Sequence, residues 1–147
     1  MARVNRTKAR LAGLDLPAPA IAAAGRPEWQ EQAQFCRWLD SWLPAHGGKY
    51  HAVVNEGRRS PGERARASAQ GLRKGVPDFY VFLPAVGLIA IEFKRRDGHA
   101  SDVRPEQRDW LAFIGEAMGA RFFAAAAFGC LDAVRFVHTL YPAAPLP

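Results

Sequence analysis

The sequence predicts an α/β protein in which a mixed sheet of about four strands is flanked by helices. Apolar residues recur at helical spacing after Pro27 and after Pro105, which predicts two amphipathic helices. Short apolar runs of strand length occupy residues 50–54, 79–83, 88–94 and 121–128. With a third helix over residues 129–141, the expected order of elements is α-β-β-β-α-β-α.

The first helix is expected to begin at Pro27 and to carry an apolar face that includes Trp29, Phe35 and Leu39. Pro44 and the Gly47-Gly48 pair end it. Residues 57–74 have little apolar content to bury, so they are expected to form a long loop with at most a short helix near residues 63–70.

The strands over residues 79–83 and 88–94 are separated by a short turn, which predicts a hairpin. Pro105 suits the first turn of the next helix, and Gly119 ends it. The apolar face expected for this helix consists of Trp110, Leu111, Phe113, Ile114 and Met118. The strand over 121–128 is expected to be buried on both faces.

The chain of 147 residues is expected to form one domain over 27–141, with a flexible basic arm at 1–26 and a Pro-rich tail at 142–147. No apolar run is long enough for a membrane helix, and a cytoplasmic location in a bacterial or phage-infected cell is expected. Cys36 and Cys130 lack metal-ligand spacing and are expected to be reduced.

The net charge of +6 and the pI of about 9.9 favour a polyanionic partner. The positive charge is concentrated before residue 75, where the sequence has 13 Lys and Arg but only 6 Asp and Glu. After that point there are 7 basic and 8 acidic residues. A soluble basic protein would also fit the charge, which on its own does not decide the partner.

The strongest chemical signal joins Asp78, which follows a Gly/Pro turn, to Glu92 and Lys94 at the end of the predicted hairpin. Alternate residues of a strand share a face, so Glu92 and Lys94 lie together while Ile91 and Phe93 face the core. If Asp78 begins the neighbouring strand, the two carboxylates lie close together. Two oxygen ligands beside a lysine suit a magnesium-dependent phosphodiesterase.

The order of several short motifs resembles the VRR-NUC family of the PD-(D/E)xK nuclease superfamily, in particular its small stand-alone members. The resemblance spans about residues 27–140. The motifs are Glu31-x-x-Gln34, Asn55-Glu56, Gly75-x-Pro77-Asp78, Glu92-x-Lys94, and then Ser101 and Gln107. It implies a restriction-endonuclease-like core.

The resemblance also implies roles for individual residues. Asp78, Glu92 and the carbonyl of Phe93 would bind Mg²⁺ or Mn²⁺, and Lys94 would be the catalytic lysine. Glu31 would support the metal site from the first helix, with Glu28 as a rival for that role. Gln107 would be an active-site residue, and Asn55, Glu56 and Ser101 are candidates for supporting the site.

The expected reaction is hydrolysis of DNA phosphodiesters by a homodimer that prefers branched DNA such as Holliday junctions. A flap- or end-processing nuclease, an RNA-processing nuclease and a non-catalytic DNA-binding protein are the alternatives. Arginine binds phosphate in a bidentate manner, so the polar segment before Asp78 is expected to contact the DNA backbone. Its basic residues are Arg58, Arg59, Arg64, Arg66, Arg73 and Lys74.

Overall fold

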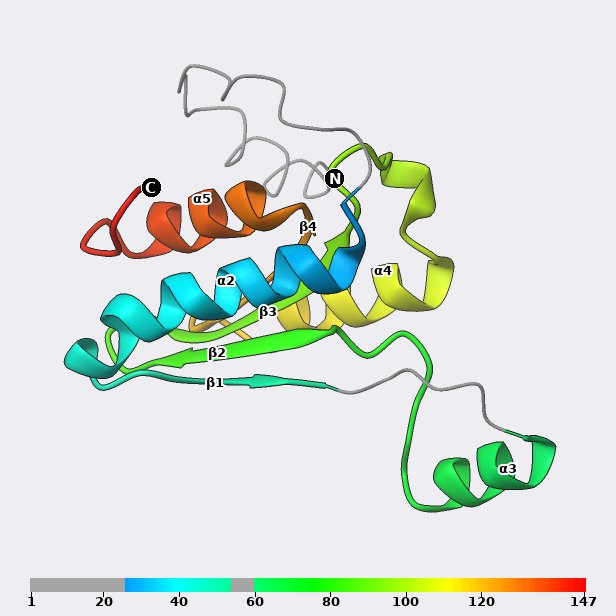
Figure 1. Cartoon of the computed structure of the whole chain (residues 1–147). Helices are drawn as coiled ribbons and strands as arrows, with labels where there is room; N and C mark the ends of the chain where they lie inside the picture. Colours follow the sequence, from blue (N-terminus) through cyan, green and yellow to red (C-terminus); the bar gives the residue numbers. More distant parts are fainter. Residues whose placement is uncertain (1–25, 54–59) are drawn as a thin grey trace, which may run out of the picture.

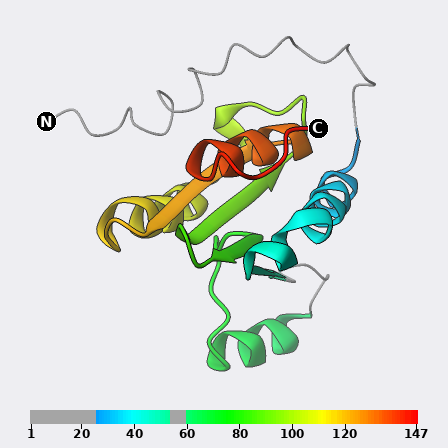
Figure 2. The same cartoon turned by 90° about the vertical axis from the view of Figure 1, so that its left-hand side faces the viewer.

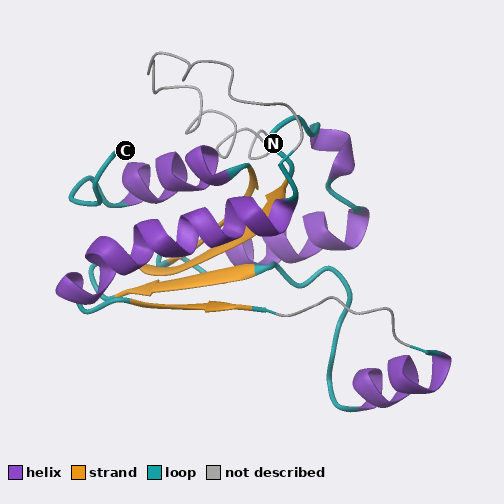
Figure 3. Cartoon of the chain, viewed as in Figure 1, coloured by secondary structure: helices purple, strands orange, loops and turns teal. Residues whose placement is uncertain are grey.

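The computed structural model describes residues 26–53 and 60–147, and it forms helical layers on both faces of one sheet (Figure 1). Figure 3 shows the same view coloured by secondary structure. The elements in chain order are α2 (Glu28–Trp42), η1 (Leu43–His46), β1 (Lys49–Ala52), α3 (Pro61–Ala69), β2 (Phe79–Leu83), β3 (Gly87–Lys94), η2 (Ala100–Asp102), α4 (Pro105–Ala112), η3 (Phe113–Ala117), β4 (Phe122–Phe128) and α5 (Cys130–Leu140). The predicted α/β class and order of major elements are confirmed, and α3 is the short helix allowed near residues 63–70.

The sheet has the strand order β1-β2-β3-β4. The β1–β2 and β2–β3 pairs are antiparallel, and the β3–β4 pair is parallel. The parallel pair requires a crossover, which α4 provides. β3 therefore has a hydrogen-bonded neighbour on each side, and it carries Glu92 and Lys94.

One face of the sheet is covered by α2 and α5, and it holds most of the core. Phe35 of α2 packs against Phe79 and Phe93, with ring centroids 5.3 and 5.5 Å apart. All three side chains are fully buried. The odd-numbered residues of β3 face this layer, so Glu92 and Lys94 face the other side of the sheet.

The opposite face is covered by α4 and η3, and here the predicted apolar face is partly wrong. Ile114 is buried, whereas Phe113 and Met118 are 52% and 42% exposed. The helix changes to a π-helical turn at Phe113, which shifts the angular spacing of the side chains that follow. Gly115 then lies against Ala124, where an added Cβ would be in van der Waals contact with that residue.

The prediction that β4 is buried on both faces is also wrong. Ala125 and Ala127 are buried, but the other residues of β4 are only half-buried. β4 is an edge strand, and the α4 layer covers it incompletely.

The helix α3 lies apart from both layers, as two perpendicular views show (Figures 1 and 2). It has a capping box in which Ser60 Oγ accepts the N–H of Glu63 and the Glu63 carboxylate accepts the N–H of Ser60. None of its residues is buried. The helix is therefore stabilised by its own caps and not by packing against the sheet.

The C-terminal residues after α5 pack against α2. Trp38 Nε1 donates to the carbonyl of Pro145 at 2.9 Å, and Ala144 is buried. Trp42 is buried and stacks on Tyr141. Cys36 and Cys130 are free thiols. No helix in the described part of the chain is long and apolar enough to cross a membrane.

Candidate active site

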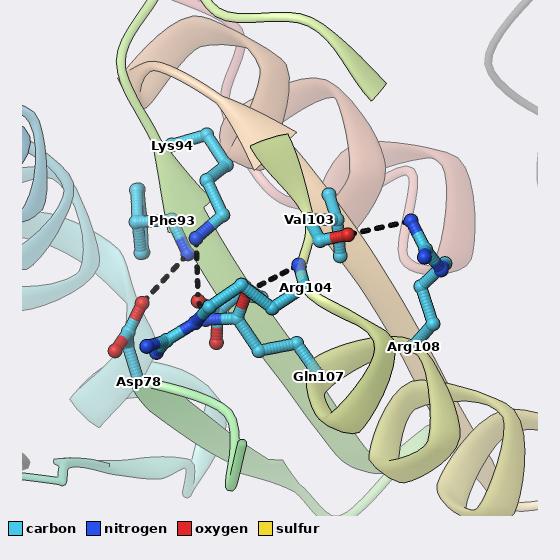
Figure 4. Close-up of polar contacts among 8 residues, drawn as sticks. Asp78, Phe93, Lys94, Val103, Arg104, Gln107 and Arg108 are labelled. Carbon is cyan, nitrogen blue, oxygen red and sulfur yellow. Dashed lines mark hydrogen bonds and ion pairs between the residues drawn. The ribbon is translucent and has the colours of Figure 1, made fainter. Parts of the chain in front are cut away.

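The register of the β2–β3 hairpin brings Asp78 and Glu92 to the same end of the sheet. Phe79 pairs with Ile91, so the next position along places Asp78 opposite Glu92. Asp78 Oδ2 accepts the backbone N–H of Phe93 at 3.0 Å (Figure 4). This bond from a side chain continues the β2–β3 pairing beyond the end of β2.

Glu92 is the centre of a buried polar cluster. It is 1% exposed, and its Oε1 lies 3.0 Å from Lys94 Nζ. The side-chain amide of Gln107 also donates to Oε1. The other carboxylate oxygen of Glu92, Oε2, is buried and accepts no hydrogen bond from the described residues. A buried carboxylate oxygen without a hydrogen-bond donor is costly, and a cation can satisfy it.

The electrostatics of the two carboxyl groups reflect their burial and their closeness. Burial, followed by the charge of Asp78, raises the pKa of Glu92 to about 7, although Lys94 opposes this rise. Burial also raises the pKa of Asp78, against the lowering effect of the Phe93 N–H and of Lys94. Both effects favour a cation between the two groups, because a cation would stabilise their charged forms.

The N-terminus of α4 fixes Gln107 against Glu92. Gln107 Oε1 accepts the backbone N–H of Arg104 at 2.8 Å, while its amide nitrogen donates to Glu92 (Figure 4). One side chain therefore caps the helix and holds the carboxylate. Gln107 is only 4% exposed, so its side chain is almost completely shielded from bulk solvent.

The segment before Asp78 is attached to the same helix. Trp110 Nε1 donates to the carbonyl of Lys74 at 3.0 Å. Gly75 has a φ of 79°, and a Cβ there would lie 2.5 Å from the backbone of Glu106. Glycine is thus required both for this backbone conformation and for the close approach to α4.

Glu31 contacts the start of α5, and its expected support of a metal stays a prediction. It is fully buried, and its Oε2 accepts the N–H of Cys130 at 2.7 Å, at the start of α5. Arg96 lies 3.5 Å from the same carboxylate. The helix that carries Glu31 packs on the sheet face opposite to Glu92 and Lys94. In this structure Glu31 therefore links α2 to the N-terminus of α5.

We expect Glu31→Ala to lower the free energy of unfolding by about 2–3 kcal/mol, because the buried Cys130 N–H loses its acceptor and the partly exposed Arg96 loses its ion-pair partner. Chemical denaturation measures the change. Glu28→Ala, at an exposed position of the same helix, is the control and should change stability by less than about 0.5 kcal/mol. Equal stabilities for the two variants would contradict the structural role of Glu31.

Two residues outside the predicted core of the site influence its charges. The charge of Glu28 contributes to the raised pKa of Asp78. Burial, followed by the charge of Glu92, raises the pKa of Tyr80. Tyr80 lies two residues after Asp78, so the period-two rule for strands could have found it. Glu28, the alternative to Glu31 in the sequence, lies about one helical turn before it.

The remaining predicted residues lie further from this cluster or outside the described residues. Asn55, Glu56, Arg58 and Arg59 fall within 54–59, which the structure does not describe. Ser101 is exposed on η2. Arg64 and Arg66 are on α3, and Lys74 follows it; all three are exposed. Arg73 donates to the carbonyls of Ser68 and Leu72 and closes the C-terminal end of α3.

Comparison with known proteins decides the family. The family model for the VRR-NUC domain matches residues 22–128. The chain belongs to the VRR-NUC family. A solved structure described as a VRR_NUC domain protein matches with a TM-score of 0.61 and 17% identity, covering 85% of this chain and 96% of that chain. No curated protein matches significantly.

The predicted VRR-NUC resemblance and the restriction-endonuclease-like α/β fold are therefore confirmed. The VRR-NUC domain is a nuclease-type domain, so the chain is related to nucleases. At 17% identity the structural match shows the fold alone.

Proposed function

We propose that this VRR-NUC protein is a metal-dependent nuclease that hydrolyses DNA phosphodiesters at the Asp78–Glu92 site. The observation that carries the proposal is the closeness of two buried carboxyl groups, Glu92 and Asp78, with the Lys94 ammonium 3.0 Å from Glu92. A protein keeps such a costly pair where a cation or a reaction needs it. Incubation of supercoiled plasmid with the protein, with and without Mg²⁺, tests the proposal.

The residues present fit a hard divalent cation such as Mg²⁺ or Mn²⁺. Asp78 and Glu92 supply carboxylate oxygens, which these ions prefer. The N–H and C=O of a strand residue leave on the same side. The Phe93 N–H points to Asp78, so its carbonyl lies on that side too, beyond the end of β2.

The protein side chains cover only part of a coordination shell. In residues 26–53 and 60–147, no three His, Cys, Asp or Glu side chains converge as a metal cluster. Mg²⁺ usually keeps several waters and binds through one or two carboxylates and substrate phosphates, so a two-carboxylate site is sufficient. When bound, the cation polarises the phosphate and stabilises the oxygens that attack and leave.

Lys94 is placed to act on the nucleophile. Its ammonium lies 3.0 Å from Glu92, shares its sheet face, and is 8% exposed. A buried ammonium next to the carboxylate can donate a hydrogen bond to the attacking water or to a phosphate oxygen, which orients the reacting groups. Gln107 holds Glu92 in place and keeps the carboxylate aligned with Lys94.

The helix α3 and the segment that leads from it to Asp78 are proposed to bind the DNA backbone. Arg64, Arg66 and Lys74 are exposed there, and no described side chain forms an ion pair with them within 4 Å. Because α3 does not pack on the sheet, its basic residues are free to follow a phosphate backbone.

We expect replacement of Arg64 and Arg66 together with Ala to weaken DNA binding by a similar factor for all sequences. Each lost phosphate contact should reduce the slope of log K against log salt by roughly 0.9. Fluorescence anisotropy at several salt concentrations measures the slope. The fold should be unaffected, since α3 buries no residue. An unchanged slope would assign these arginines to solubility.

The preference for branched DNA and the homodimer remain proposals. Their support is the small size of the domain and the resemblance to stand-alone family members. Two of the three tryptophans of α2, Trp38 and Trp42, pack within the chain and so do not support a dimer. Trp29 is 65% exposed and is still available for a partner.

We expect light scattering to give about twice the mass of 16.2 kDa, and a four-way junction to compete better than linear duplex for binding. A dimer related by a two-fold axis presents two sites to a substrate of matching symmetry. A monomer that cuts duplex and junction at equal rates would contradict this proposal and would favour a flap- or end-processing nuclease.

A further inference from the structure

Arg104 occupies the N-cap position of α4, where an arginine is unfavourable. Ser, Thr, Asn and Asp are preferred at an N-cap, and a cation is repelled by the positive end of the helix dipole. The Arg104 side chain makes no capping hydrogen bond. The cap is provided by Gln107, whose Oε1 accepts the Arg104 N–H. The guanidinium of Arg104 therefore contributes nothing to the start of the helix.

The neighbouring arginines are all used within the protein. Arg95 binds Asp97, Arg96 binds Glu31, and Arg108 donates to the carbonyl of Val103 at 2.6 Å. The side chain of Arg104 is exposed, and no hydrogen bond or ion pair ties its guanidinium to the described residues. Its five N–H donors are available to a ligand.

The direction of this side chain connects it to the active site. In Figure 4 it extends from the N-terminus of α4, across Gln107 and toward Asp78. It stops short of an ion pair with Asp78 or Glu92. A guanidinium that points toward Asp78 and has no partner among the described residues can bind a group that carries negative charge of its own.

We propose that Arg104 binds the scissile phosphate of the DNA strand, an inference that rests on the proposed nuclease function. Its planar fork matches two phosphate oxygens, which a lysine cannot bind in the same way. Lys94 already interacts with Glu92 at 3.0 Å, whereas the guanidinium of Arg104 has no ion-pair partner within residues 26–53 and 60–147. It would stabilise the charge on the phosphate as the bond to the leaving oxygen breaks.

The replacement Arg104→Ser separates this catalytic role from a structural one. Serine is a favoured N-cap, so the melting temperature should rise or stay unchanged. Cleavage of plasmid DNA in Mg²⁺ under single-turnover conditions should fall by about 10²-fold, as on loss of one donor to a transition-state oxygen. Because many other cations bind the backbone, DNA affinity should change little, and Arg104→Lys should recover only part of the rate.

Arg37→Ser is the matched control, because it removes the same charge from an exposed position of α2. It should cleave at the wild-type rate. If Arg104→Ser also cleaves at that rate, the role of Arg104 is wrong while the nuclease proposal stands. If Arg104→Ser melts at a lower temperature and loses cleavage only in proportion to the unfolded fraction, its role is structural and the proposal fails. A wild-type protein that cleaves neither plasmid nor four-way junction in Mg²⁺ or in Mn²⁺ would overturn both proposals.

Discussion

Replacement of Glu92 with glutamine is expected to reduce DNA cleavage by roughly 10³-fold or more while DNA binding persists. Glutamine keeps the shape and can still meet Lys94 and Gln107, but it removes the charge that a divalent cation needs. Calorimetric titration with Mn²⁺ should show binding to the wild-type protein and much weaker binding to the variant. Glu116→Gln, an exposed change of equal charge on η3, is the control and should behave as wild type.

The raised pKa of Glu92, about 7, gives this prediction a pH dependence. A metal ligand must be deprotonated, so Mn²⁺ affinity should rise with pH up to about 7, and binding below that value should release protons. In the metal-free protein, the contribution of Glu92 to stability changes with pH in the opposite direction. The contribution of Glu92 is favourable at low pH and is lost as pH rises from the ordinary glutamate value of 4.5 through about 7. Metal affinity that is constant from pH 5 to 8 would contradict Glu92 as a ligand.

Replacement of Lys94 with methionine is the second large effect, and we expect cleavage to fall by about 10²–10³-fold. Methionine keeps most of the apolar stem but donates no hydrogen bond to the water or the phosphate. DNA affinity should be nearly unchanged, since the exposed arginines supply most of it. Lys49→Met, at the other end of the sheet, is the control.

A second consequence of Lys94→Met distinguishes loss of chemistry from loss of metal. Lys94 lowers the pKa of Glu92, so its removal should move the onset of Mn²⁺ binding to higher pH. At pH 9 the variant should bind the metal and still fail to cleave. Recovery of the wild-type rate at pH 9 would show that Lys94 acts only through Glu92, and wild-type cleavage at every pH would show that it has no role.

The centre of the site followed from the sequence because it depends on local geometry. Strand periodicity placed Glu92 and Lys94 on one face, and a hairpin with a short turn brought Asp78 opposite Glu92. The family motifs added Gln107, which the structure places in contact with Glu92. These are short-range relations that a single sequence can encode.

The placement of Glu31, Phe113 and Arg104 depended on tertiary packing that no local sequence pattern reveals. Glu31 binds the start of α5 because α2 covers the sheet face opposite to Glu92, and a sequence does not say which face a helix will cover. The π-helical turn at Phe113 turned part of an expected core face outward. The direction of Arg104 is likewise visible only once α4 is placed beside Asp78.

The most direct test of a metal-dependent nuclease is incubation of supercoiled plasmid with the purified protein in Mg²⁺, in Mn²⁺ and in EDTA. The Asp78–Glu92 site predicts nicked or linear DNA in at least one of the two metals and intact plasmid in EDTA. The Glu92→Gln protein should leave the plasmid intact throughout, which excludes a contaminating nuclease. Intact plasmid and intact four-way junction in both metals, or equal cleavage in EDTA, would contradict the proposed function.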